Sequence, residues 1–295
     1  MKKIILCAYP RAGLANKLLV LAKCHARAYE SGAIVVETTF AQLPLFSALR
    51  NLCQPRIYLL GPVKTKLRSS FFWKVLYELR LTYIVFRPLR QFLQFETIDY
   101  FDSYPSYTNP YGDLTSDNTG ETVKSILRNR LGLSPALIKK HQNNDMATAA
   151  IHIRLGDFKA STDGRIRPNT RMSLDYYIDL IQRLISFYSQ ITLPWQINVY
   201  TDEPALVRRV IPHQKEIQVC SGSPFEDFVD LVECDVLAPS PWSTFSGLAA
   251  HLSTNKVIVL PIELHFQFQD NKDLVVSSPS SLNSALKEYY SNSLR

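Results

Sequence analysis

The chain has 295 residues, 46% of them apolar and 20% charged, so it can bury a sizeable core and does not belong to the disordered class. Its five cysteines are scattered and odd in number, with no CxxC pair. This excludes a disulfide framework and a zinc site and indicates reduced thiols in a cytosol.

The first half of the chain begins as a strand–turn–helix–strand unit, which is typical of a parallel α/β domain. The expected elements are a strand at 3–9, a helix at 14–29, a strand at 34–36, a mostly helical segment at 67–93, a loop at 104–119 and a short helix at 122–131. The apolar run after Met1 ends within five residues, too short for a signal peptide, and no 18-residue apolar stretch predicts a spanning helix.

A polar hinge at 143–145 precedes a second half in which strands and helices alternate about five times. The expected strands are 147–153, 197–200, 217–220, 236–238 and 256–260, and the expected helices are 173–188, 204–210, 225–234, 243–252 and 282–290. This pattern predicts a doubly wound, Rossmann-like lobe. We therefore expect two lobes, residues 1–145 and 146–295.

The strand at 147–153 carries a polar motif at its end, His152-Ile153-Arg154-Leu155-Gly156-Asp157. His152 and Arg154 lie on the face opposite to Ile153, at the carboxyl edge where α/β folds place ligands. A guanidinium there can form two charge-assisted hydrogen bonds to a diphosphate. A strand that ends in a surface turn is the alternative interpretation.

Three further segments are also candidates for binding a ligand. The helix start Ser243-Thr244-Phe245-Ser246 offers hydroxyls and free N–H groups to a phosphate. Asp202, in Tyr200-Thr201-Asp202-Glu203, follows a strand and could accept from a ribose or hold His152. The turn containing Gly13 and Asn16 permits close approach of a ligand. Each has an ordinary structural alternative, a helix cap for the first two and a plain βα turn for the third.

In chain order these motifs read RxGLxN, HxRxGD, YTDE and CDxLxxSxxSTFSxxAAxLS. Together they resemble the fucosyltransferase superfamily, and among its groups the bacterial α1,2-fucosyltransferases of glycosyltransferase family 11. The resemblance covers the first thirty residues and most of the second half. It implies a GT-B-like fold, with two Rossmann-like lobes facing across a cleft, and an inverting, metal-independent transfer of fucose from GDP-fucose to a glycan hydroxyl, α1,2 to galactose.

The resemblance also implies roles for individual residues. It assigns Arg154 to the diphosphate, His152 to the neighbourhood of the guanosine, Asp235 to the guanine N–H groups and Gly13 with Asn16 to the opposite wall of the cleft. The phosphate-binding helix start corresponds to Ser243, Thr244, Phe245 and Ser246. Two positions depart from the pattern: Leu155 stands where many members have a second arginine, and Ala15 replaces a glycine.

No DxD pair stands in a phosphate-side loop and no His/Cys/Asp cluster has metal-ligand spacing, so we expect neither metal nor cofactor. Arg154 and the helix start must then stabilise the departing diphosphate. Asp157, Asp163 and Glu203 are the candidates for a base, with Asp157 first because it is nearest the motif; orienting Arg154 is its alternative role. Leu155 motivates an alternative donor, another nucleotide sugar. A non-catalytic nucleotide- or glycan-binding protein is the alternative of another class.

The net charge of +7 is concentrated in residues 64–90, where seven cations accompany one anion and six aromatic residues. This segment predicts peripheral contact with the inner face of the plasma membrane, suited to a lipid-linked acceptor. A solvated helix face or an acceptor groove is the alternative. No nucleic-acid-binding module is recognisable. We expect a cytoplasmic protein whose partners are a nucleotide sugar and a glycan acceptor in surface polysaccharide or oligosaccharide synthesis.

Overall fold

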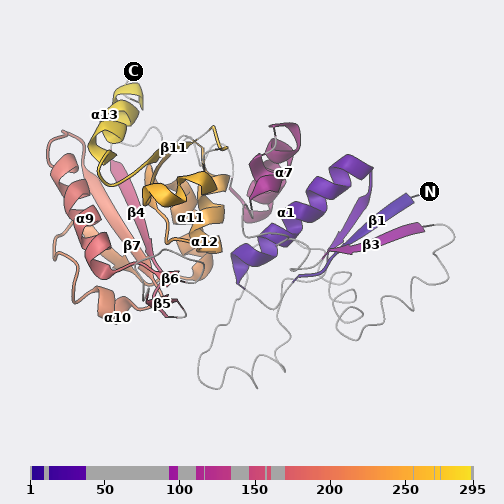
Figure 1. The fold of residues 1–295 in the computed structure, drawn as a ribbon, viewed down its shortest axis with the longest axis horizontal. Helices are drawn as coiled ribbons and strands as arrows, with labels where there is room; N and C mark the ends of the chain where they lie inside the picture. The colour runs from indigo at the N-terminus through magenta and orange to yellow at the C-terminus, as the bar shows by residue number, and fades with distance from the viewer. Residues whose placement is uncertain are drawn as a thin grey trace. The chain divides into compact units, whose positions relative to one another are not determined.

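The computed structural model describes residues 2–9, 13–37, 93–98, 111–115, 117–133, 146–156, 158–160, 170–254, 256–268, 270–272 and 274–293. The chain divides into two compact units, Met1–Gly132 and Leu133–Arg295. Each unit combines helices with a sheet in which every strand pair is parallel, which confirms the predicted α/β class (Figure 1). The predicted boundary at 145/146 borders residues 134–145, which lie outside the described residues, as does the basic segment 64–90. The cleft between the lobes stays a prediction.

The described sheet of the first unit has the strand order β2-β1-β3. Its elements are β1 (Lys2–Cys7), α1 (Leu14–Ser31), β2 (Ile34–Glu37), β3 (Leu93–Ile98), α6 (Gly112–Thr115) and α7 (Asp117–Leu131). Helix α1 buries the apolar stripe that its spacing predicts, and it ends at Gly32, whose φ of 64° suits glycine. The N–H of Gly32 bonds to the carbonyl of Ala28 and closes the helix.

Three elements of the first unit differ from the prediction. Residues 93–98 form strand β3, because their backbone pairs with β1 along its full length. Helix α6 lies inside the expected loop 104–119, and α7 begins five residues earlier than expected, at Asp117. Polar residues dominate the starts of both helices, so the sequence shows little helical periodicity there.

The second unit has a six-stranded sheet of order β11-β10-β9-β4-β7-β8. The strands are β4 (Ala147–Ile153), β7 (Trp195–Thr201), β8 (Ile217–Cys220), β9 (Val236–Ala238), β10 (Lys256–Val259) and β11 (Leu274–Ser277). The helices are α9 (Leu174–Tyr188), α10 (Pro204–Val207), α11 (Pro224–Glu233), α12 (Thr244–Leu252), the 3-10 helix η2 (Ile262–Gln267) and α13 (Leu282–Ser293). The short strands β5 (Lys159–Ala160) and β6 (Thr170–Arg171) pair separately.

Strand β11 follows 256–260, the segment that the sequence predicts as the last strand. It pairs with β10 from Lys256↔Leu274 to Val259↔Ser277, and it is an edge strand of four residues. Pairing with a neighbour stabilises such a short segment, so its own sequence carries a weak signal.

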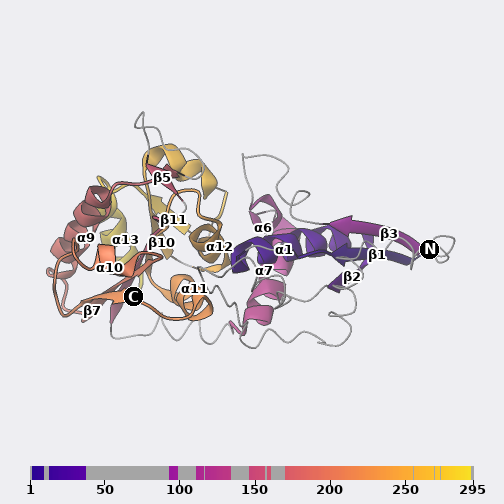
Figure 2. The ribbon, with the colours of Figure 1, turned by 90° about the horizontal axis from the view of Figure 1, so that it is seen from below.

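Helices cover both faces of this sheet (Figure 2). Helices α9 and α13 pack against the face that carries Ile151 and Ile153, in one hydrophobic core. Helices α11 and α12 cover the opposite face, which carries His152. Because neighbouring residues of a strand point to opposite faces, β4 contributes apolar side chains to one helix layer and polar ones to the other.

A buried lysine fixes the end of α11. Lys256 is 1% exposed, and its ammonium donates to the carbonyls of Leu231 and Val232 at 2.6 and 2.9 Å. A cation at a helix carboxyl terminus satisfies carbonyls that lack intrahelical partners. The strand order and this cap together hold α11 and α12 against the same face of the sheet.

No helix among the described residues is long and apolar enough to cross a membrane.

Candidate functional site

The candidate site lies where the strand order of the second unit reverses. From β4 the chain proceeds to β7 and β8 on one side, then crosses back to β9, β10 and β11 on the other. The loops after β4 and β9 therefore leave the sheet in opposite directions and open a crevice at its carboxyl edge. In open α/β sheets this crevice is where ligands bind. The residues after β4, β7 and β9 and at the start of α12 are accordingly the ones to consider.

His152 spans this crevice from β4 to α12. Its Nδ1 lies 2.9 Å from Oγ of Ser246, and its ring lies 5.5 Å from that of Phe245. Phe245 in turn contacts Phe228 of α11 edge-on, with ring centroids 5.2 Å apart. The structure thus brings together three of the predicted site residues on two elements that are about ninety positions apart in the sequence.

His152 is neutral at physiological pH. Burial lowers its pKa to about 4, the Arg154 guanidinium lowers it further, and Asp202 partly opposes both. The Ser246 hydroxyl accepts the N–H of Ser240 at 3.2 Å, and we assign its own hydrogen to Nδ1 of the neutral imidazole. The proton of His152 then sits on Nε2, for which no hydrogen bond to a described residue exists. The ring can therefore donate one hydrogen bond to a ligand.

A single carboxylate organises the turn after β4. Asp202 follows β7, and its Oδ1 accepts the N–H of Leu155 at 2.9 Å. Its Oδ2 accepts the N–H of Gly156 at 2.9 Å and lies 3.1 Å from a guanidinium nitrogen of Arg154. A Cβ on Gly156 would approach that same oxygen to 2.8 Å, so glycine is needed for the close approach. Asp202 is thus in a position to orient Arg154. From the sequence, we expect this role only of Asp157.

Arg154 and Leu155 point to different surroundings. The Arg154 side chain is 22% exposed, so part of the guanidinium is accessible from outside. Leu155 is 4% exposed and belongs to the hydrophobic core on the α9 face. The position at which the motif departs from the fucosyltransferase pattern it resembles is therefore part of the core. Asp157 and Asp163 lie outside the described residues, whereas Glu203 is exposed and lies beside Gly156.

The start of α12 has donors that the helix itself does not use. Ser243 is the N-cap, and its side chain makes no capping hydrogen bond, although it is 8% exposed. The Oγ of Ser240 is buried beside the Tyr177 hydroxyl of α9. The first N–H groups of any helix lack intrahelical acceptors, and they carry the positive end of the helix dipole. With half-buried Thr244, these groups make the helix start suitable for a phosphate.

The structure does not bring Asp235 to this group. Asp235 immediately precedes β9, so it lies at the amino edge of the sheet, at the other end of the strands. Its Oδ2 accepts from the backbone and hydroxyl of Thr148 at 2.7 and 3.0 Å, and Oδ1 accepts from Tyr289 at 3.4 Å. These contacts tie β9 to β4 and α13. Burial raises the pKa of Asp235, and the Thr148 hydrogen bonds oppose that rise.

A second acidic group at the carboxyl edge was not expected from the sequence. Helix α11, which follows β8, carries Glu226, Asp227 and Asp230. The Tyr200 hydroxyl donates to Asp230 at 2.9 Å. Glu226 completes a capping box with Ser223 at the start of the helix. Asp227 accepts a hydrogen bond from the backbone N–H of Gly222. Burial, and then Asp230 and Glu226, raise its pKa to about 6. Its signal in the sequence, an acid in the first turn of a helix that follows a strand, resembles ordinary capping.

Gly13 and Asn16 belong to the first unit. Gly13 precedes α1 with a φ of −63°, which any residue can adopt. The Oδ1 of Asn16, in the first turn of α1, is buried without a partner. Arg11 lies outside the described residues. The structure therefore gives Asn16 an unused acceptor at the carboxyl edge of the first sheet.

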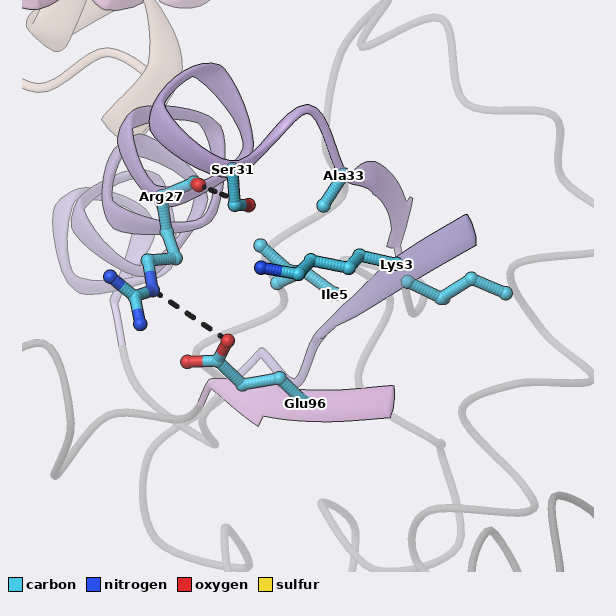
Figure 3. A pocket seen from close by; sticks show the side chains of 7 residues that line it. Lys3, Ile5, Arg27, Ser31, Ala33 and Glu96 are labelled. Atoms are coloured by element: carbon cyan, nitrogen blue, oxygen red, sulfur yellow. Dashed lines mark hydrogen bonds and ion pairs between the residues drawn. The ribbon is translucent and has the colours of Figure 1, made fainter. Parts of the chain in front are cut away.

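A pocket of about 280 Å³ lies in the first unit, beside the end of α1 (Figure 3). Lys3, Arg27, Ser31 and Glu96 are among its lining residues, and an Arg27–Glu96 ion pair at 3.7 Å crosses it. Lys3 stands at the start of β1, so the pocket is at the amino side of that sheet. It is separate from every residue that the motifs predicted.

Among the described residues, no group of three or more His, Cys, Asp and Glu side chains could hold a metal ion. The absence of a metal or cofactor requirement stays a prediction.

No family model and no curated protein matches the sequence. Among solved structures, similar chains include the fucosyltransferase NodZ from Bradyrhizobium, with 14% identity, a TM-score of 0.42, and 86% of this chain and 94% of that chain covered. The ADP-heptose lipopolysaccharide heptosyltransferase II of E. coli has 11% identity and a TM-score of 0.47, with both chains fully covered. A variant of Arabidopsis thaliana FUT1 in complex with GDP has 12% identity and a TM-score of 0.39, with 87% and 69% covered.

Proposed function

We propose that the chain is an inverting glycosyltransferase that moves fucose from GDP-fucose to a glycan hydroxyl. The observation that carries the proposal is the contact of His152 with Ser246, which joins β4, the strand that precedes Arg154, to the start of α12. The motif order that resembles the fucosyltransferases supplies the identity of the donor. The 2-hydroxyl of galactose is the acceptor to be tested first.

The diphosphate is assigned to Arg154 and the first turn of α12. A guanidinium held by Asp202 loses little freedom when it binds phosphate oxygens, because its orientation is already set. The N–H groups after Ser243 provide donors from the other side of the crevice. Both partly neutralise the charge that develops on the leaving diphosphate.

The guanine is assigned to Asp227 in place of Asp235, since Asp227 lies on the ligand edge and Asp235 does not. A carboxylate with a pKa of about 6 is largely ionised at pH 7 and can accept from the two N–H groups on one side of guanine. Adenine and the pyrimidines do not present this pair of donors. Half-buried Phe245 contacts His152 on one side and Phe228 of Asp227's helix on the other, so the nucleoside would lie against Phe245.

In the transfer step, the oxygen of the acceptor hydroxyl attacks the anomeric carbon from the side opposite to the diphosphate. The bond from that carbon to the β-phosphate oxygen breaks, and its electron pair leaves with GDP. The proton of the hydroxyl passes to a base, for which exposed Glu203 is the described candidate and Asp157 and Asp163 remain candidates from the sequence. The oxocarbenium character of the transition state means that weak base assistance suffices.

The deciding experiment measures fucosyl transfer from GDP-fucose to a panel of galactosides, with donor hydrolysis measured in parallel. Wild type should transfer, and Arg154→Ala should lose transfer while it stays folded. Arg183→Ala is the matched control, because that arginine lies on the exposed face of α9, paired with Asp179. Full activity of Arg154→Ala contradicts the proposal. GDP binding without transfer or hydrolysis would instead establish the non-catalytic alternative.

Thermal-shift titrations decide the donor nucleotide. GDP should stabilise the chain much more than UDP or CMP, since only the cognate nucleotide binds the folded state tightly. Asp227→Asn should reduce the shift given by GDP. A larger shift with another nucleotide would favour the alternative donor that Leu155 suggests.

A further inference from the structure

The loop between β9 and α12 contains a strained tryptophan. Among the residues that the structure describes, Trp242 is the one residue other than glycine with a positive φ, 59°. The N–H of Ser243 bonds to the carbonyl of Ser240 at 3.0 Å, which closes a turn with Pro241 second and Trp242 third. A turn with proline second and a positive φ at the third position is of type II, which normally has glycine at that third position. The chain therefore places a bulky side chain where the backbone favours having none.

The indole of Trp242 has an unused polar group. Its Nε1 is buried and has no hydrogen-bond partner, which is unusual because a shielded indole N–H normally finds an acceptor. Strain and an unsatisfied donor at one residue are typical of positions retained for binding. Both occur directly before Ser243, the N-cap of the helix assigned to the diphosphate.

The surroundings of the indole are apolar and accessible. Its ring lies 5.9 Å from that of Phe266 on η2, a helix that follows β10 at the same carboxyl edge. Phe266 is 37% exposed and Ile262, one turn earlier, is 68% exposed. Trp242 thus carries a hydrogen-bond donor and contacts an exposed apolar surface. It lies next to the expected position of the β-phosphate.

We infer that Trp242 is a specificity-determining residue that recognises the 6-deoxyhexosyl group of the donor. The inference rests on the proposed function. In this proposal a hexosyl group on the β-phosphate of a ligand bound at α12 lies against the residue that precedes Ser243. The methyl group of a 6-deoxyhexose suits the apolar surface of Trp242, Phe266 and Ile262, and its ring or hydroxyl oxygens can accept from the indole after a small rotation.

The test compares wild type with Trp242→Gly and Trp242→Phe as full chains. Glycine removes the indole and keeps the turn, since it adopts positive φ freely, while phenylalanine keeps a ring without the N–H. Trp195→Phe is the matched control; Trp195 begins β7 at the amino edge and stacks on Tyr188 at 5.7 Å. Calorimetric titration gives the Kd of GDP, GDP-fucose and GDP-mannose, whose C6 carries a hydroxyl, and circular dichroism verifies folding.

Wild type should bind GDP-fucose more tightly than GDP-mannose. Trp242→Phe should weaken GDP-fucose binding about fivefold, as expected for one lost hydrogen bond, and Trp242→Gly should weaken it more and remove the preference for GDP-fucose. GDP binding should stay unchanged in both variants, and Trp195→Phe should resemble wild type with all three ligands.

Two results overturn the inference while the proposed function stands. One is an unchanged preference for GDP-fucose in both Trp242 variants. The other is an equal loss of GDP and GDP-fucose binding, which would indicate a role in the phosphate site or in the turn. If wild type binds neither GDP nor GDP-fucose, the proposed function fails, and the inference fails with it.

Discussion

Replacing Asp202 by asparagine removes the charge that organises the turn after β4. Asparagine can still accept the N–H of Leu155 through its one oxygen. Its amide nitrogen then faces the N–H of Gly156 and the guanidinium of Arg154, which are both donors, where the carboxylate oxygen accepted at 2.9 and 3.1 Å. The variant therefore loses two charge-assisted contacts and keeps the shape of the side chain.

The expected loss follows from the geometry. The two side chains of the ion pair are 22% and 18% exposed, so solvent screens their attraction only in part. A hydrogen bond that involves a charged group contributes about 1.5–3 kcal/mol, and partial exposure and relaxation reduce the sum for two contacts. We expect the free energy of unfolding to fall by about 2–3 kcal/mol, which corresponds to roughly 4–10 °C in the melting temperature of a unit of this size.

The assay is thermal and urea denaturation of wild type and Asp202→Asn, each with and without GDP. Stabilisation by GDP should also shrink, because Arg154 is no longer held toward the crevice. Asp179→Asn is the matched control, since it breaks an aspartate–arginine pair of 2.8 Å on an exposed helix face and should change little. If Asp202→Asn is as stable as this control and binds GDP as tightly as wild type, Asp202 does not organise the turn.

Three further changes test neighbouring features. Gly156→Ala should cost about 1–3 kcal/mol, because its Cβ would lie 2.8 Å from the Asp202 carboxylate, and a double-mutant cycle with Asp202→Ala should recover much of that loss. Between pH 6.5 and 4 the unfolded chain protonates His152 before the folded chain does, so stability should fall by up to about 3 kcal/mol as pH drops through this window. In urea titrations at pH 7.5 and 5, His152→Gln should lack that part of the pH dependence; an unchanged dependence would assign it to other groups. Lys256→Met should cost about 1–3 kcal/mol in the same measurement, because the Leu231 and Val232 carbonyls lose a charged donor and keep only a thiol and a shared hydroxyl. An equally stable variant would contradict that role.

In the second unit, the sequence predicted the helices and strands wherever the spacing of apolar residues determines which of the two forms. The strand at Ala147–Ile153 and the helix that begins after Ser173 have the predicted bounds, because both bury a periodic apolar face. Strands β3 and β11 were missed, since pairing with a neighbouring strand stabilises them and their own sequence is weakly patterned.

In the candidate site, too, some features could be predicted from the sequence and others could not. That His152 and Arg154 share a face and an edge follows from the period of a strand, and the sequence predicted it. The contact of His152 with Ser246 arises because the chain crosses the sheet between β8 and β9. The spacing of the two residues in the sequence does not predict this crossing. The placement of Asp235 could have been corrected from the sequence alone. A residue that immediately precedes a strand of a parallel sheet lies at the amino edge, away from the ligand edge.

The turn at Ser240–Ser243 also predicts how the protein responds to selection. Its buried Ser240 hydroxyl, its unsatisfied indole N–H and its strained backbone are all unfavourable for the folded state on their own. A screen for heat resistance that ignores activity should therefore accumulate substitutions in these four residues early, with glycine or asparagine at position 242. A screen that retains sugar transfer should leave them intact, so comparing the two mutation spectra would separate what this turn does for folding from what it does for catalysis.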